Sequence, residues 1–251
     1  MAPRVPRPTL PRVKPPKALL LDLDETLLDG RGLARAIQGT CERLAASHSS
    51  LDAARLRAAN AEVWEAYFPG VEPYWVLGQL DGASLVREAW RRTLAACGTS
   101  DESLLRLASQ THHELSAREH RLFDDAVELL ARAKRVGLPL ALITNGASDT
   151  QREKLRVLEL EPWFGAIVVS GELGIAKPDP AGFRRALQQL GVAPADAWHV
   201  GDSLADDVAG ARATGMTGIW LNRAGRPRRP DQPEPHLEIG SLRDLGPFLP
   251  E

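Results

Sequence analysis

The sequence is poor in cysteine and has no long hydrophobic run. Its 251 residues include only Cys41 and Cys97, which are too few for a disulfide framework and lack the spacing of a metal site. The apolar stretches at 18–21 and 138–143 are too short to cross a bilayer, and the basic, proline-rich start has no apolar core of a secretory signal. We therefore expect a cytoplasmic protein that does not associate with membranes.

The chain also lacks an excess of charge of one sign. It has 31 Lys and Arg residues against 33 Asp and Glu residues, so no global field would draw it to nucleic acid. A small anionic substrate needs only a local positive charge. Lysine is a scarce source of such charge, because only five lysines occur in the whole chain and none of them lies between residues 31 and 118.

Short apolar runs alternate with helical patterns along most of the chain. The runs cover residues 18–22, 138–144, 166–170, 198–202 and 217–221. This alternation is typical of a parallel sheet, because parallel strands must be joined by crossover connections that are usually helices. The sequence therefore predicts an α/β fold with a doubly wound, Rossmann-like core of five or more parallel strands.

One connection is much longer than an ordinary crossover. Residues 31–118 show four successive helical patterns, at 33–47, 51–67, 84–96 and 102–115, with a break predicted at Pro69, Gly70 and Pro73. We interpret this stretch as an inserted α-helical cap domain, so that residues 18–30 and 119–251 form the core. Residues 1–17 are predicted to be a disordered, basic, proline-rich extension.

Acidic residues follow the first and the fourth predicted strands. Asp22 and Asp24 follow the first, and Asp202 and Asp207 follow the fourth. We expect these two strands to be neighbours, and ligands of open parallel sheets bind beyond the carboxyl ends of the strands. One carboxylate could attack phosphorus while another transfers protons, and the oxygen ligands suit Mg²⁺. Each pair alone would also fit ordinary turn or helix-capping acids.

Polar and basic residues follow the second and third predicted strands. Thr144 and Asn145 precede a predicted helix, where a hydroxyl group and backbone N–H groups could hold phosphate oxygens. Lys177 follows the third strand and could neutralise the phosphate. Alone, these residues would fit a plain turn and a surface charge. Lys134 and Lys154 fall within predicted helices, so Lys177 is the lysine that we assign to the site.

The four motifs together resemble the haloacid dehalogenase superfamily, in its phosphatase branch with a helical cap inserted after the first strand. They are D-x-D-x-T from Asp22, T-N from Thr144, K-P from Lys177 and G-D-x-x-x-x-D ending at Asp207. The stretch TNGASDTQREKL is similar to the N-acylneuraminate-9-phosphatase and nucleotidase-like group. The resemblance implies that Asp22 is the nucleophile and Asp24 the acid and base. The Mg²⁺ ligands are then expected among Asp22, the Asp24 carbonyl, Asp202 and Asp207.

The expected activity is Mg²⁺-dependent hydrolysis of a small phosphate monoester through an aspartyl phosphate on Asp22. The acid at Asp24 favours an alcohol leaving group, because a halide departs without a proton. Two alternatives remain, a sugar phosphomutase of the same superfamily and a catalytically silent protein that binds a phosphorylated ligand. The expected partner is a small phosphorylated metabolite, and the protein is expected to be a monomer or a homodimer.

Overall fold

The computed structural model describes residues 14–249. Most of the predicted extension, residues 1–13, lies outside the described part of the chain. Residues 14–17 of the extension are described and lie against the core. Nζ of Lys14 and Nζ of Lys17 lie 2.8 and 2.7 Å from carboxylate oxygens of Asp196. These pairs are largely exposed and contribute little to stability.

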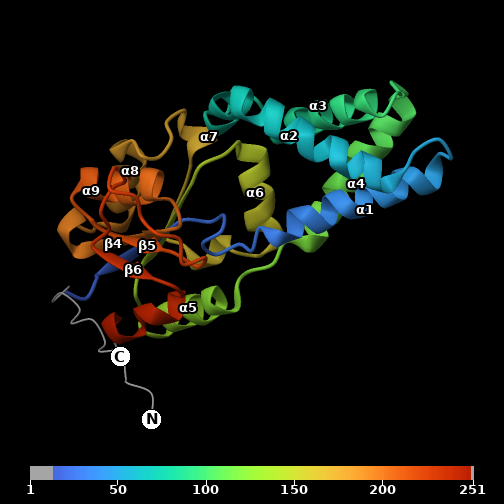
Figure 1. Ribbon diagram of the computed structural model, residues 1–251. Coiled ribbons are helices and arrows are strands. Elements are labelled where there is room, and N and C mark those ends of the chain that lie inside the picture. Colours follow the sequence, from blue (N-terminus) through green and yellow to red (C-terminus); the bar gives the residue numbers. More distant parts are fainter. Residues whose placement is uncertain (1–13, 250–251) are drawn as a thin grey trace, which may run out of the picture.

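Six parallel strands form one sheet in the order β3-β2-β1-β4-β5-β6, of which Figure 1 labels β4, β5 and β6. The strands are β1 (Ala18–Leu21), β2 (Leu140–Thr144), β3 (Ala166–Val169), β4 (Ala197–Gly201), β5 (Thr217–Leu221) and β6 (Leu237–Ile239). The predicted α/β parallel core is confirmed, including the expected adjacency of β1 and β4. The short β6 was not among the predicted runs, because three residues after a proline-rich loop give too little pattern.

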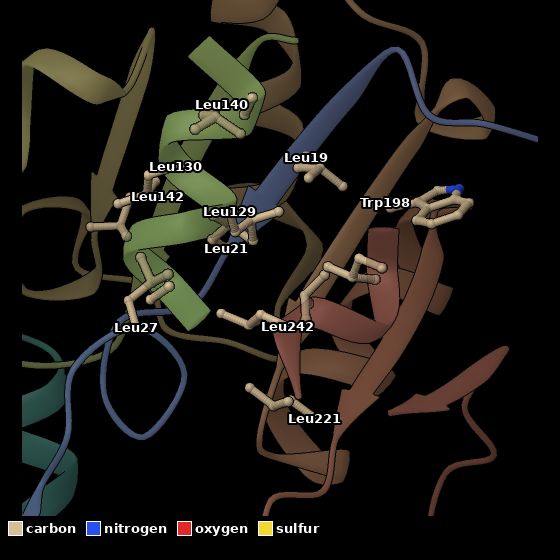
Figure 2. Packing of buried hydrophobic residues seen from close by; sticks show 14 of the residues in the cluster. Leu19, Leu21, Leu27, Leu129, Leu130, Leu140, Leu142, Trp198, Leu221 and Leu242 are labelled. Atoms are coloured by element: carbon tan, nitrogen blue, oxygen red, sulfur yellow. The ribbon is translucent and has the colours of Figure 1, made fainter. Parts of the chain in front are cut away.

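Helices cover both faces of the sheet, as a parallel sheet requires. The helix α5 (Asp124–Arg135) and the 3₁₀ turns η4 (Leu242–Phe248) cover one face, and α8 (Pro180–Leu190) and α9 (Ala209–Thr214) cover the other. Leu19 and Leu21 of β1 pack toward α5, as Figure 2 shows, while Leu20 belongs to the opposite cluster. Each fully buried leucine contributes about 2 kcal/mol through removal of apolar surface from water.

Between β1 and β2, four helices precede α5. They are α1 (Arg31–Ser47), α2 (Ala53–Val76), α3 (Gly82–Ala96) and α4 (Glu102–Glu119), and we call residues 31–119 the helical segment. The segment has its own apolar core, centred on Leu44, Leu56, Trp90 and Leu94. Among the described residues, no helix combines the length and the apolar character needed to cross a membrane.

The predicted break within the second helix is wrong. Helix α2 continues through Pro69, Gly70 and Pro73 to Val76, nine residues beyond the predicted end at residue 67. Proline removes a helical N–H donor and leaves the carbonyl four residues earlier without its partner. Both prolines lie on the exposed side of the helix, where water can satisfy such carbonyls. The interruption therefore comes later, between α2 and α3.

The helical segment contacts the core through two short helices that follow strands. Helices α3 and α4 pack against α6 (Ser148–Val157), and α2 packs against α7 (Ser170–Leu173) (Figure 1). The backbone N–H groups of Gly82 and Ala83, at the start of α3, donate to the two carboxylate oxygens of Asp149 at 2.9 and 3.1 Å. A carboxylate of the core thus caps a helix of the helical segment.

Candidate active site

Three carboxylates converge beyond the carboxyl ends of β1 and β4. Asp22, Asp202 and Asp207 each offer an oxygen, and these atoms all lie within 4.8 Å of one another. Asp207 comes from a π-helical turn, η3 (Leu204–Val208), and its carboxylate lies directly against the end of β4. A Cβ atom on Gly201 would lie 2.1 Å from the Asp207 carboxyl carbon, so only glycine permits this approach.

Lys177 joins two of these carboxylates in the interior. Its Nζ donates to Oδ1 of Asp22 at 2.6 Å and to Oδ1 of Asp207 at 2.7 Å. The side chains of Lys177, Asp22 and Asp207 are only 4%, 8% and 1% exposed. Charges buried to this degree are tolerated only when they are paired. The sequence had assigned all three residues to the site, and the structure brings them together.

Asn145 holds the loop that carries this lysine. The backbone N–H of Lys177 donates to Oδ1 of Asn145 at 2.9 Å, and Nδ2 of Asn145 donates to the Lys177 carbonyl at 3.1 Å. The carboxamide therefore acts as a two-point bridge between the ends of β2 and β3. The next backbone N–H, that of Gly146, donates to Oγ of Ser170 at 2.9 Å. This backbone N–H, in the turn where the sequence suggested phosphate donors, is therefore already used within the protein.

A histidine that the sequence analysis did not consider completes the buried set. Nε2 of His199, on β4, lies 2.9 Å from Oδ1 of Asp207. Burial lowers the pKa of His199 below its ordinary value despite the neighbouring carboxylate, so the ring is neutral at pH 7 and donates from Nε2. The sequence did contain a signal for His199, because it is a polar residue in an otherwise apolar, fully buried strand.

This buried group contains more acidic than basic side chains, and the pKa values of the acids reflect the imbalance. Burial raises the pKa of Asp22 to about 8, although the Lys177 ammonium opposes the change. Loss of surrounding water and repulsion from Asp207 raise the pKa of Asp202 to about 6. Burial also acts to raise the pKa of Asp207, but Lys177 and His199 outweigh it and hold that pKa well below its usual range. One ammonium group thus faces three carboxyl groups.

The donor set fits a divalent cation. It consists of oxygen atoms, which Mg²⁺ prefers, and a positive ion would oppose the burial and the repulsion from Asp207 that raise the pKa of Asp22. The three acids do not offer equal access. Both oxygens of Asp207 already accept hydrogen bonds within the protein, including one from the Ser203 N–H at 3.0 Å. Asp22 and Asp202 are therefore the more available direct ligands.

Asp24 lies beside the group, and its carboxylate is held by two residues of α6. Nζ of Lys154 donates to both Asp24 oxygens, at 2.7 and 2.9 Å, and Nε2 of Gln151 donates to Oδ2 at 2.9 Å. The same Gln151 amide group donates to the Thr144 hydroxyl. Sequence reasoning missed both residues. A signal was present, because they lie three residues apart in the helix that begins just after Asn145.

The contacts also set the ionisation of Asp24. Burial acts to raise the pKa of its carboxyl group, but the charge of Lys154 and the hydrogen bonds from Lys154 and Gln151 outweigh that effect. The net result is a pKa below the ordinary aspartate value. A carboxylate in this state is ready to accept a proton.

The end of α2 reaches the same edge of the sheet. The Trp75 ring lies against Gly146, where an added Cβ atom would come within 2.8 Å of it. Oγ of Ser170 donates to the Val76 carbonyl at 2.5 Å. The helical segment is thus in contact with the loop that follows β2, next to the predicted phosphate site.

A model of haloacid dehalogenase-like hydrolases matches residues 16–215. The chain belongs to this family. It is 36% identical over 252 residues to phosphoserine phosphatase of Thermus thermophilus, with 94% of this chain and 99% of that protein covered. It is 35% identical over 132 residues to N-acylneuraminate-9-phosphatase of Mus musculus, with 52% of this chain and 53% of that protein covered. These relatives agree with the predicted phosphatase branch, and the protein is a hydrolase of this branch.

Solved structures support the same fold. The HAD-hydrolase YfnB from Bacillus subtilis, in a structure bound to magnesium, superposes with a TM-score of 0.66. The two sequences are 26% identical, and the match covers 95% of this chain and all of that one, 100%. The similarity therefore extends over the core and the helical segment together.

Proposed function

We propose that the protein is a Mg²⁺-dependent phosphatase that hydrolyses a small phosphate monoester through an aspartyl phosphate on Asp22. The observation that supports this proposal most is the buried pairing of Asp22 with Lys177, next to the acids Asp202 and Asp207. Few structural needs would place three acids and one lysine at one edge of a sheet. Strongly perturbed, clustered carboxyl groups are typical of catalytic sites.

The residues divide the reaction into two proton-balanced steps. An Asp22 oxygen attacks phosphorus, the ester P–O bond breaks, and the leaving alcohol oxygen takes a proton through Asp24, which is a carboxylate in the free enzyme and receives this proton from the bound phosphate monoanion. Water then attacks the phosphorus of the aspartyl phosphate and gives a proton to Asp24, the bond from phosphorus to Asp22 breaks, and Asp24 passes the proton to the released phosphate. Lys177 would offset negative charge in both steps, and the Thr144 hydroxyl is the group assigned to contact the phosphate.

The Mg²⁺ site belongs to the same proposal. Asp22, Asp202 and the Asp24 carbonyl would hold the ion, with Asp207 contributing directly or through water. The ion supplies positive charge that reduces repulsion between the nucleophile and the anionic substrate. The magnesium bound to YfnB, a relative in structure and sequence, supports this assignment.

The helical segment is proposed to be the cap domain that selects the substrate. The contact of Trp75 with the loop at Gly146 supports this role. The match to the phosphoserine phosphatase covers 94% of this chain and so includes the helical segment, whereas the N-acylneuraminate-9-phosphatase match covers only 52%. We therefore propose a small phosphorylated acid such as O-phosphoserine as the first candidate. A cytoplasmic location agrees with the free thiols of Cys41 and Cys97.

A substrate panel tests the activity directly. O-phosphoserine, sugar phosphates, nucleotides and sialic acid phosphates are each incubated with Mg²⁺ or with excess chelator, and released phosphate is measured. Hydrolysis should require Mg²⁺, and acid quenching should trap labelled phosphate on Asp22. Transfer of the phosphate to a second hydroxyl of the substrate, in place of water, would identify a phosphomutase.

The nucleophile is tested by Asp22→Asn, with Asp206→Asn as the matched control. Asp22→Asn should reduce turnover by at least about 10³-fold, because removal of a catalytic nucleophile removes the covalent route. Asp206 lies on the same turn as Asp207, but within the described part of the chain its side chain hydrogen-bonds only to Ser203, so its variant should retain activity. Full activity in excess chelator, or an active Asp22→Asn variant, would refute the mechanism.

A further inference from the structure

We infer that Lys154 and Gln151 are positioning residues that hold the Asp24 carboxylate in place for proton transfer. The inference rests on the proposed function, because it assigns to these residues a role in the two steps that Asp24 would serve. Neither residue is expected to touch the reacting phosphorus. Their effect on the reaction should pass entirely through Asp24.

The contacts around Lys154 fix both oxygens of Asp24. The ammonium group bridges them at 2.7 and 2.9 Å, and the Lys154 side chain is only 13% exposed. Such a charge-assisted, two-point contact opposes rotation of the carboxylate plane. An exposed ion pair would not do so, because it exchanges with water and its side chains move freely.

Gln151 holds the ammonium group of Lys154 in position. Its Oε1 accepts from Nζ of Lys154 at 2.7 Å, and its Nε2 donates to Asp24 and to Thr144. The side chain is fully buried, so both ends of the carboxamide have partners and its orientation is determined. One carboxamide therefore links the acid and base to the hydroxyl that is assigned to the phosphate.

The arrangement leaves Asp24 open on one side. A carboxylate has about four acceptor positions, and Lys154 and Gln151 together use three of them. The Asp24 side chain is 41% exposed, so the remaining position can face a leaving group or a water molecule. A group that is oriented in advance avoids the loss of rate that even a small misplacement causes.

Kinetics of Lys154→Met test this role, with Lys134→Met as the matched control. Lys134 lies on α5, where its ammonium stands 5.0 Å above the Trp163 ring, and the variant should behave as the unaltered enzyme. Lys154→Met should lower kcat on an alkyl phosphate by roughly 10- to 100-fold, with KM changed less than about twofold. With an aryl phosphate, whose leaving group needs no proton, the burst of phenol should persist while later turnover stays slow.

Lys154→Met is then combined with Asp24→Asn in a double variant. If Lys154 acts through Asp24, the double variant should be no slower than Asp24→Asn alone. Multiplied losses would overturn the inference, because they would mean that Lys154 acts on the substrate independently. A raised KM with unchanged kcat would overturn it for the same reason.

A measurement without substrate separates this inference from the proposed function. Chemical unfolding of Asp24→Asn, Lys154→Met and the double variant, without Mg²⁺, should show strongly non-additive changes in stability. Additive changes would overturn the contact itself, even in an active phosphatase. If the unaltered protein hydrolyses no ester, the proposed function fails, and the role in proton transfer fails with it even when the unfolding coupling is present.

Discussion

The core and the helical segment bury different kinds of polar groups. Among the described residues, the buried acids and the buried lysine all lie in the core: Asp22, Asp125, Lys177 and Asp207. The buried polar residues of the helical segment are Thr40, Asn60, Thr93, Thr111 and His112. Burial of charge costs several kcal/mol per ion unless partners compensate. The core buries charged groups at the candidate site, whereas the buried polar residues of the helical segment include no acid and no lysine.

The largest change in stability is expected in the core, where the charge of Lys177 compensates the buried acids. Lys177→Met leaves Asp22 and Asp207 without their shared ammonium group and should lower the free energy of unfolding by about 3–5 kcal/mol. Lys134→Met, on the surface of α5, should change it by less than about 0.5 kcal/mol. Denaturant titration of both variants measures the difference. Equal stability of the two variants would mean that the buried charges do not depend on this pairing.

A pH-dependent effect is expected in the helical segment. His112 packs against the Trp90 ring, and burial lowers its pKa from 6.5 to about 4. Between these values the unfolded state binds a proton that the folded state does not, so stability falls as the pH drops from 6.5 to 4. The loss should be about 3 kcal/mol when complete. The helical segment is thus expected to be less stable in acid, because among the described residues its interior has no partner for the charge of a protonated His112.

Hydrogen exchange in α3 and α4 measures this dependence. His112→Gln should remove most of the added exchange between pH 6.5 and 4, because the substituted side chain does not titrate. His113, the exposed neighbour of His112, supplies the control His113→Gln, which should keep the unaltered profile. Identical profiles for His112→Gln and the unaltered protein would show that another group controls the acid response.

The smallest expected effect concerns the contact between the two regions. Asp149→Ala removes the acceptor of the Gly82 and Ala83 N–H groups and should destabilise the start of α3 by about 1 kcal/mol. Asp101→Ala removes a similar cap from α4 without touching the core. Exchange at Gly82 and Ala83 should accelerate only in Asp149→Ala. Equal acceleration in both variants would mean that α3 is held by its own segment and not by the core.

The sequence predicted the parts of the site that depend on strand order. The runs of apolar residues locate β1 and β4, and the expected adjacency of these strands places Asp22 near Asp202, as the structure does. Lys177 was also assigned correctly to this edge of the sheet by its place after β3. Such inferences succeed because the carboxyl ends of parallel strands must meet at one edge.

The parts that depend on side-chain direction could not be predicted in the same way. Lys154 was set aside because it lies in a helix, yet the phase of α6 turns it toward Asp24. Nothing in the sequence indicated that the carboxamide of Asn145 hydrogen-bonds the Lys177 backbone, 32 residues further along the chain. Helix phase and loop bridges follow from tertiary packing, which a local pattern does not contain.

The insertion between β1 and β2 also determines the order in which the protein can assemble during synthesis. Leu19 pairs with Leu140 on one side and with Trp198 on the other, so β1 leaves the ribosome long before either partner strand exists. The helical segment ends at residue 119 and contains its own apolar core, so it can fold before the partner strands of β1 have been synthesised. Asp22 is therefore among the first residues of the site to be made, and it acquires its charged partners only after Lys177 and Asp207 emerge.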